Sequence, residues 1–180
     1  MDVSRAVATN VAVREFQSNR IGMPGLMKIL EAGRQCQSGK NIQPWYFIII
    51  EKREMLDKLA ELMKGDVDEE IMKKSSLAVA IVGDPAGEFY TFDCGRAAQN
   101  MTLVSWELGI GSCIVSGPEP PDRENYRVKA GQLLKVPSNL RFLELMIFGY
   151  PKAKRTVHTK RRKKLEDIVF KEEFGRTINE

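Results

Sequence analysis

The sequence has little histidine and little cysteine. His158 is the single histidine, and the three cysteines, Cys36, Cys94 and Cys113, lie far apart and form no C-x-x-C pair. One histidine excludes most histidine-based metal sites and most catalysis by a Ser-His or Cys-His pair, so we expect no metal. A sparse, odd cysteine count without a secretion signal is typical of reduced intracellular thiols, which predicts a cytoplasmic protein whose cysteines are small buried residues.

Long apolar runs and the common nucleotide-binding loops are also missing. No run of about 18 apolar residues occurs, so no membrane partner is expected. The first 16 residues lack the pattern of a signal peptide. Neither G-x-G-x-x-G nor G-x-x-x-x-G-K-[ST] is present, which excludes the two commonest phosphate-binding loops. With 180 residues, 43% of them apolar, the chain is long enough for one domain around one core.

The positive charge is concentrated in one segment. Residues 152–164, "KAKRTVHTKRRKK", hold eight Lys and Arg and no acid, which leaves 20 basic against 24 acidic residues elsewhere. Such a run suggests nucleic acid, phosphate or a solvated arm. Because no aromatic residues alternate with the basic ones, the run is poorly suited to stacking on bases, and we expect no nucleic-acid partner.

Apolar periodicity predicts helices and strands in an order typical of an α+β fold. The order is not the strict strand–helix alternation of a Rossmann domain. The expected helices cover residues 3–9, 26–36, 52–65, 92–108 and 122–134, and the expected strands cover 45–50, 77–84, 111–115 and 140–150.

Two segments have apolar faces that call for a second packing surface. The helix over 92–108 is apolar on two faces, with Met101 on one and Trp106 on the other, which indicates burial on two sides or at a subunit interface. The segment Leu165–Phe174 is amphipathic and follows the basic run, away from the compact body. It therefore needs another surface on which to bury its apolar residues, and a neighbouring subunit would supply one.

Two stretches are specific when they occur together: "SGKNIQPW" and the helix "DCGRAAQNM…ELGIGSC". With five others, they make almost the whole chain resemble the nitroreductase family of FMN-dependent oxidoreductases. The matching stretches, in the family's order, are "VREF" (13–16), "ILEAGRQCQSGKNIQPWYFIII" (29–50), "AVAIVGDP" (78–85), "FDCGRAAQNMTLVSWELGIGSC" (92–113), "LKVPSNL" (134–140), "FGYP" (148–151) and "KRRKKLEDIVF" (160–170).

The resemblance implies a homodimer with FMN at the subunit interface. It implies an α+β fold with a central, mostly antiparallel sheet flanked by helices. Residues 1–164 would form one flavin-binding domain, and residues 165–180 an arm that packs on the partner. NADH or NADPH would be the co-substrate, and a small nitroaromatic or quinone the electron acceptor. Flavin N5 would carry the chemistry in a ping-pong order, without a catalytic side chain.

The resemblance also implies which residues hold the phosphate side of the flavin. The family places an arginine, a serine and a second basic residue where this chain has Asn10, Ala12 and Arg14. Only Arg14 keeps its type, and its implied role is positive charge near the flavin pyrimidine. Lys160 and Arg162 match the family's phosphate-binding pair. Because Asn10 and Ala12 remove polar contacts, we expect FMN binding that is weaker than is usual in the family and depends steeply on salt.

The ring of the flavin would meet two further stretches. The partner subunit would contribute the loop of Ser38, Gly39, Lys40 and Asn41, while Gln43 would tie that loop to its own backbone. Near N5 the implied residues are Ile114, Val115, Ser116 and Gly117, with Ile114 and Val115 against the ring and the Ser116 N–H as donor. Pro44 and Trp45 are expected to be structural, and Asp93 and Arg96 to form a local charge network.

Other functions remain open at this point. The chain could be a flavin-dependent dehydrogenase or dehalogenase of the same superfamily, or a flavin-binding sensor without turnover. The short polar segment Gly65–Ser76, "GDVDEEIMKKSS", is expected to act as a lid that influences acceptor choice.

Overall fold

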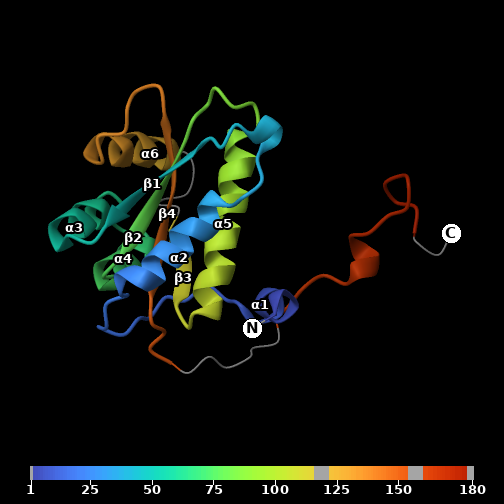
Figure 1. The fold of residues 1–180 in the computed structure, drawn as a ribbon, viewed down its shortest axis with the longest axis horizontal. Coiled ribbons are helices and arrows are strands. Elements are labelled where there is room, and N and C mark those ends of the chain that lie inside the picture. The colour runs from blue at the N-terminus through green and yellow to red at the C-terminus, as the bar shows by residue number, and fades with distance from the viewer. Residues whose placement is uncertain (1, 116–121, 154–159, 178–180) are drawn as a thin grey trace.

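The computed structural model describes residues 2–115, 122–153 and 160–177. Within them, a four-stranded antiparallel sheet in the order β1–β2–β4–β3 lies between two layers of helices (Figure 1). The predicted α+β class is confirmed. The helices are α1 (Val3–Thr9), α2 (Met23–Arg34), α3 (Arg53–Glu61), α4 (Val67–Lys74), α5 (Tyr90–Glu107) and α6 (Asp122–Leu133), and the strands are β1 (Trp45–Ile50), β2 (Ala78–Gly83), β3 (Gly111–Val115) and β4 (Arg141–Gly149).

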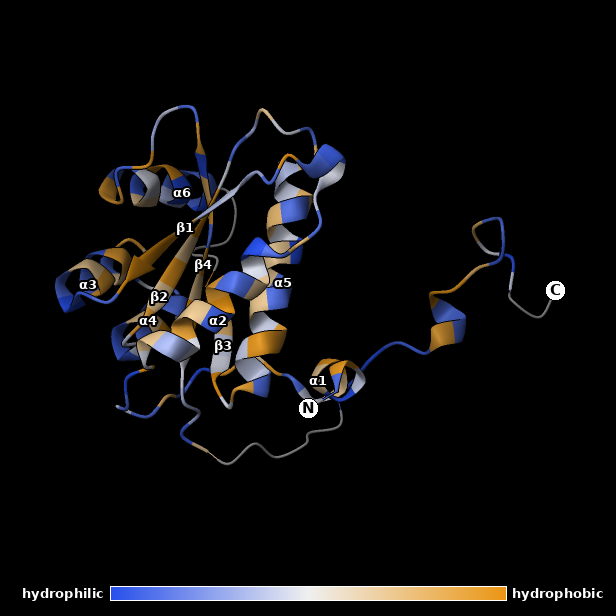
Figure 2. Ribbon diagram, in the orientation of Figure 1, coloured by the Kyte–Doolittle hydropathy of each residue, from blue (hydrophilic) through white to orange (hydrophobic). Residues whose placement is uncertain are grey.

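The core lies on both faces of the sheet. On one face α2 and α5 bury Ile29 and Met101, and on the other α3 and α4 bury Leu59 and Met72. Hydrophobic and hydrophilic residues alternate along these helices, as expected for helices with one buried side (Figure 2). Because both faces are covered, β2 is buried along its whole length, and only the edges at β1 and β3 border the surface.

Gly33 allows α2 to approach α5 closely. A Cβ atom at Gly33 would lie 2.9 Å from Met101 Sδ and 2.9 Å from Phe47 Cζ. Real Cβ atoms do not approach other side chains this closely, so a larger residue would displace both neighbours. The glycine thereby lets α2 fix the long helix α5 on the sheet.

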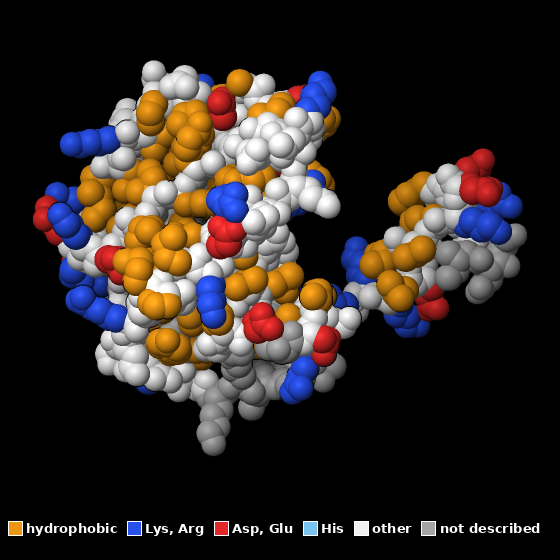
Figure 3. Space-filling view, in the orientation of Figure 1, with side chains coloured by type: hydrophobic (Ala, Val, Ile, Leu, Met, Phe, Trp, Pro, Cys, Tyr) orange, Lys and Arg blue, Asp and Glu red, His pale blue; other side chains and the backbone are white. Residues whose placement is uncertain are grey.

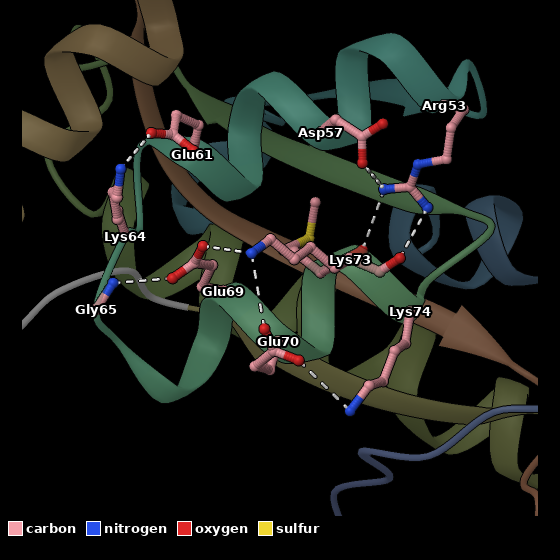
Figure 4. A network of polar contacts seen from close by, with 10 residues as sticks. Arg53, Asp57, Glu61, Lys64, Gly65, Glu69, Glu70, Lys73 and Lys74 are labelled. Atoms are coloured by element: carbon pink, nitrogen blue, oxygen red, sulfur yellow. Dashed lines mark hydrogen bonds and ion pairs between the residues drawn. The ribbon is translucent and has the colours of Figure 1, made fainter.

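The segment Gly65–Ser76 is a packed helix rather than the predicted polar lid. Its helix α4 buries Met72 completely. Lys73 of α4 pairs with Glu69 at 2.6 Å, and the Glu69 carboxylate accepts a hydrogen bond from the Gly65 N–H (Figure 4). These bonds tie the helix to the turn before it, so the segment is part of the body of the protein.

An N-terminal segment runs along the edge of β3. Ala12 forms a parallel bridge with Ser112, and the Val13 N–H donates to the Ser112 carbonyl at 2.9 Å. A Cβ atom at Gly111 would lie 2.6 Å from Val13, so the glycine makes this approach possible. The segment places Arg14 beside the edge of the sheet.

The chain beyond Lys164 extends away from the body (Figure 1). Among residues 165–177, regular structure is limited to a short 3₁₀ helix, η2 (Leu165–Asp167). Leu165 is 72% exposed and Phe174 is 94% exposed. The sequence predicts an amphipathic segment here, and its apolar residues stay largely exposed, although the rings of Phe170 and Phe174 pack on each other with their centroids 4.6 Å apart.

In the described part of the chain, no helix combines the length and the apolar character needed to span a membrane.

Candidate functional site

The loop Ser38–Asn41 has an unusual backbone. It forms a 3₁₀ turn, η1 (Gly39–Asn41), in which Lys40 has φ 51° and Asn41 has φ 56°, and Gln43 follows with φ 54°. Left-handed conformations are uncommon for residues other than glycine, and they persist only where the surroundings enforce them. Here the Gln43 N–H donates to Ser38 Oγ at 2.9 Å, and its side chain donates to the Asn41 carbonyl at 3.3 Å. The predicted role of Gln43 is confirmed.

The first turns of α5 hold this loop. The Gly39 N–H donates to Asp93 Oδ2 at 3.1 Å, and a Cβ atom at Gly39 would lie 3.0 Å from the ring of Phe89. Arg96 lies 3.5 Å from the Asp93 carboxylate and donates to Gln37 Oε1 at 2.7 Å. The local charge network predicted for Asp93 and Arg96 is confirmed, and its link to the loop is new.

A second polar group lies near α1. Lys160 Nζ donates to the Val7 carbonyl at 2.7 Å and to Asn10 Oδ1 at 3.0 Å. Burial, and to a smaller extent the nearby Arg162 guanidinium, lower the pKa of Lys160. Asn10, in which the sequence indicates only a lost cation, therefore orients a lysine of the basic run.

Arg14 and Ile114 are both exposed. Arg14 makes no hydrogen bond or ion pair with the residues that the structure describes, and its charge opposes the rise in the pKa of the Cys113 thiol that burial causes. The Ile114 side chain is 48% exposed, whereas Val115 is fully buried in the core. Neighbouring residues of a strand point to opposite faces, so only Ile114 offers its side chain to a ring, and Val115 contributes backbone at most.

The last two residues predicted near N5, Ser116 and Gly117, lie outside the described residues, as does His158.

The two polar groups lie at opposite ends of α5. The loop is bonded to Asp93 near the start of the helix, whereas α1 is tied to its end by Trp106 Nε1, which donates to Thr9 Oγ1 at 2.9 Å. Asp93 and Trp106 are thirteen residues apart, which is about 20 Å of helix. Loop and lysine in one chain are therefore too far apart to form one compact site.

The family follows from a direct comparison. The model of the nitroreductase family matches residues 8–86 and 82–150, which together cover most of the chain. The chain belongs to the nitroreductase family. Its predicted resemblance to that family is confirmed.

Several relatives support this membership. An *Archaeoglobus fulgidus* protein provisionally named NADH dehydrogenase/NAD(P)H nitroreductase is 31% identical over 153 residues, which cover 82% of this chain and 84% of the relative. An iodotyrosine deiodinase of *Thermotoga neapolitana* is 22% identical and covers 77% of this chain and 83% of that protein. An FMN-dependent nitroreductase of *Clostridium difficile* has the same fold, with a TM-score of 0.82 and 23% identity over 92% of this chain and 96% of the other.

The residues of this nitroreductase-family chain fit a flavin mononucleotide. Lys160 uses two donors within the protein and has a third left for a phosphate oxygen. The exposed Ile114 offers an apolar surface to a ring. Beside it lies a groove of about 540 Å³, within the usual size range of small-molecule sites. Among its lining residues, Arg127 pairs with Glu144 at 2.9 Å.

Sequence reasoning missed two contacts of the site. It did not foresee that Asp93 binds Gly39, 54 positions earlier, or that Asn10 binds Lys160, 150 positions later. The sequence offers one signal for the first contact. Asp93 is an acidic residue in the first turn of a helix that is otherwise rich in buried residues, so it needs a partner. Nothing in the local sequence indicates the second. In the described ranges, no group of three His, Cys, Asp or Glu side chains is placed to hold a metal ion.

Proposed function

We propose that this chain is an FMN-dependent oxidoreductase, in which hydride passes from NADH or NADPH to flavin N5 and then, in ping-pong order, to an electron-poor nitroaromatic or quinone. The observation that carries the proposal is the pair of polar groups at opposite ends of α5 in a nitroreductase-family chain. The names of its relatives support it, since they include an NAD(P)H nitroreductase and an NADPH:FMN oxidoreductase.

The phosphate of the cofactor would bind at Lys160 and Arg162. Asn10 Oδ1 and the Val7 carbonyl hold the lysine ammonium in place, so its remaining donor has a fixed direction. Arg162 adds a planar guanidinium, which suits phosphate oxygens. Arg14, which is exposed beside the sheet edge, would place its charge near the pyrimidine ring.

The ring would lie between two subunits. One protomer supplies Ile114 and the adjoining backbone of Val115, together with Ser116 and Gly117, and its partner supplies the loop Ser38–Asn41. The length of α5, which separates loop and lysine in a single chain, supports placing these two groups in different subunits of one site. The groove beside Ile114 would then receive the nicotinamide and the acceptor in turn.

The arm over residues 165–180 would complete the dimer by packing on the domain formed by residues 1–164 of the partner. Its exposed apolar residues need a surface. The edge strand β1 offers one, because Tyr46 is 52% exposed and Ile49 is 41% exposed there. A groove of about 390 Å³ beside β1 includes Ile49 and Leu134 in its lining.

The decisive experiment is spectroscopic. The purified protein is loaded with FMN, its visible spectrum is recorded, and NADH or NADPH is added without oxygen. We expect loss of the flavin absorption, and its return when a nitroaromatic or quinone is added. A flavin that neither nucleotide bleaches would contradict the proposal and favour a flavin-binding sensor. Because two curated relatives are named iodotyrosine deiodinase, iodotyrosine belongs among the acceptors, and its exclusive reduction would favour the dehalogenase alternative.

The phosphate contact has its own test. Lys160→Ala should raise the Kd for FMN about tenfold or more, because it removes a charged hydrogen bond, and should make binding less sensitive to salt. Lys163→Ala is the matched control. It removes the same charge, but from an exposed side chain three residues further along the chain. Fluorescence titration at low and high salt measures both variants. An equal effect of the two changes would mean that the charge of the whole run, rather than a contact of Lys160, attracts the cofactor.

A further inference from the structure

Asp93 is a buried carboxylate that the proposed chemistry does not use. It is 3% exposed, and it lies in the first turns of α5 among Cys94 and other residues of the core. A buried charge is unfavourable unless it is hydrogen-bonded and paired. Its partners are the Gly39 N–H at 3.1 Å and the Arg96 guanidinium at 3.5 Å. The buried Asp93 carboxylate is therefore energetically unfavourable by itself, and its main hydrogen-bond partner is the backbone of the loop.

The loop needs such a partner. Lys40 and Asn41 both adopt left-handed backbone conformations, each of which is strained for a residue with a side chain. The Gly39 N–H comes directly before them, and its bond to Asp93 joins the loop to the long helix α5, which packs on the sheet. Arg96 extends the connection to Gln37 on the other side of the loop. Residues 37–41 are thus held at two points by one helix.

We propose that Asp93 is a positioning residue for the flavin loop. It holds Gly39 so that the strained residues Lys40 and Asn41 present their polar groups to a flavin in the partner subunit. The inference rests on the proposed function. Asp93 does not touch the cofactor itself, because its carboxylate is buried and already bonded. It acts by fixing a backbone that would otherwise relax. A relaxed loop would have to be ordered when the flavin binds, and this loss of conformational entropy would weaken binding.

The test compares Asp93→Ala and Asp93→Asn with Asp57→Asn, which removes an exposed carboxylate on α3 that pairs with Arg53. Asparagine keeps an oxygen that can accept from Gly39 but loses the charge, whereas alanine loses both. Three measurements are made on each protein: amide hydrogen exchange of residues 37–41 without flavin, the Kd for FMN, and the visible circular dichroism of bound FMN.

We expect faster exchange at Gly39 and a Kd raised about tenfold in Asp93→Ala, with smaller changes in Asp93→Asn and none in Asp57→Asn. The flavin signal should change in the same order, which a general loss of stability would not produce. Faster loop exchange with an unchanged Kd and flavin signal would overturn the inference, as would weaker binding with an unchanged loop. Failure of the unmodified protein to bind FMN would overturn the proposed function as well. Normal binding that Asp93→Ala leaves intact would overturn this inference alone.

Discussion

Cys94 lies beside Asp93, inside the core on which α5 packs. Burial, reinforced by the neighbouring carboxylate, raises the pKa of the Cys94 thiol from 9.0 to about 12. Cys113 is also buried, and Cys36 is half-buried with its pKa raised for the same reason. Such thiols are poor nucleophiles at neutral pH. The prediction that the cysteines are small buried residues is confirmed for Cys94 and Cys113.

This environment predicts a loss of stability in alkali. Between pH of about 9 and about 12 the unfolded chain releases the Cys94 proton while the folded protein keeps it. The folded state then binds more protons, so the free energy of unfolding falls as pH rises, by at most about 1.4 kcal/mol per pH unit. Cys94→Ala should flatten the slope of the free energy of unfolding against pH. Cys36→Ala should change that slope less, because Cys36 is less buried. Urea unfolding at a series of alkaline pH values measures both, and equal slopes in all three proteins would contradict the prediction.

At the scale of elements, α3 and α4 are joined by one arginine. Arg53, the first residue of α3, pairs with Asp57 at 2.8 Å and donates to the carbonyl of Lys73 at 3.1 Å (Figure 4). It also donates to the carbonyl of Ser75 at 2.8 Å. The last carbonyls of a helix lack partners within the helix, so Arg53 satisfies the end of α4 from a neighbouring element.

Arg53→Ala should therefore destabilise the protein by about 1–3 kcal/mol, because a charged donor to backbone acceptors is lost. The control is Arg34→Ala. The Arg34 side chain pairs with Glu31 on the exposed side of α2, so its loss should lower the free energy of unfolding much less. Chemical unfolding of both variants gives the two values. A loss in Arg34→Ala as large as that in Arg53→Ala would mean that the end of α4 does not depend on this arginine.

Most elements could be predicted from the sequence, because their apolar spacing matches the period of a helix or a strand. The strand over 45–50 has the predicted bounds, and the long helix begins two residues earlier than expected. The helix α4 was missed although Asp68 and Glu69 near its start and Lys73 and Lys74 at its end are helix signals. The polar composition of the segment favours a lid instead, because the apolar residues that the structure shows buried in it are adjacent and show no helical spacing. The site was predicted by resemblance, whereas its anchors join residues far apart in sequence and required the fold.

At the scale of the whole molecule, exposed apolar residues of the described chain include groups on the body and on the arm. Apolar side chains are visible over the face formed by α2 and α5 and on the separate arm (Figure 3). Met27 on α2 is 53% exposed, Phe92 on α5 is 67% exposed, and Phe174 of the arm is 94% exposed. Surfaces of this kind mark sites of association, which is consistent with the proposed dimer.

Removal of the arm should weaken the dimer. A chain that ends at Lys164 loses the largely exposed apolar residues of the arm. We expect it to elute as a smaller species or as a concentration-dependent mixture, and to bind FMN less tightly, since the proposed site needs two subunits. Phe174→Asp tests the apolar contact alone, with Lys171→Gln as a control in the same segment. Light scattering after size-exclusion chromatography measures the mass, and a stable dimer of the shortened chain would contradict the prediction.

The length of α5 also allows defects in two different copies to compensate for each other. A copy with a broken loop still offers an intact lysine end, and a copy lacking Lys160 still offers an intact loop. In the proposed dimer, when two variants that bind FMN weakly are mixed and their subunits exchange, each hybrid contains one site assembled from sound parts and one that is doubly defective. At an FMN concentration too low to fill either variant alone, mixing the two should therefore restore binding and activity, whereas mixing two variants of the same end should not.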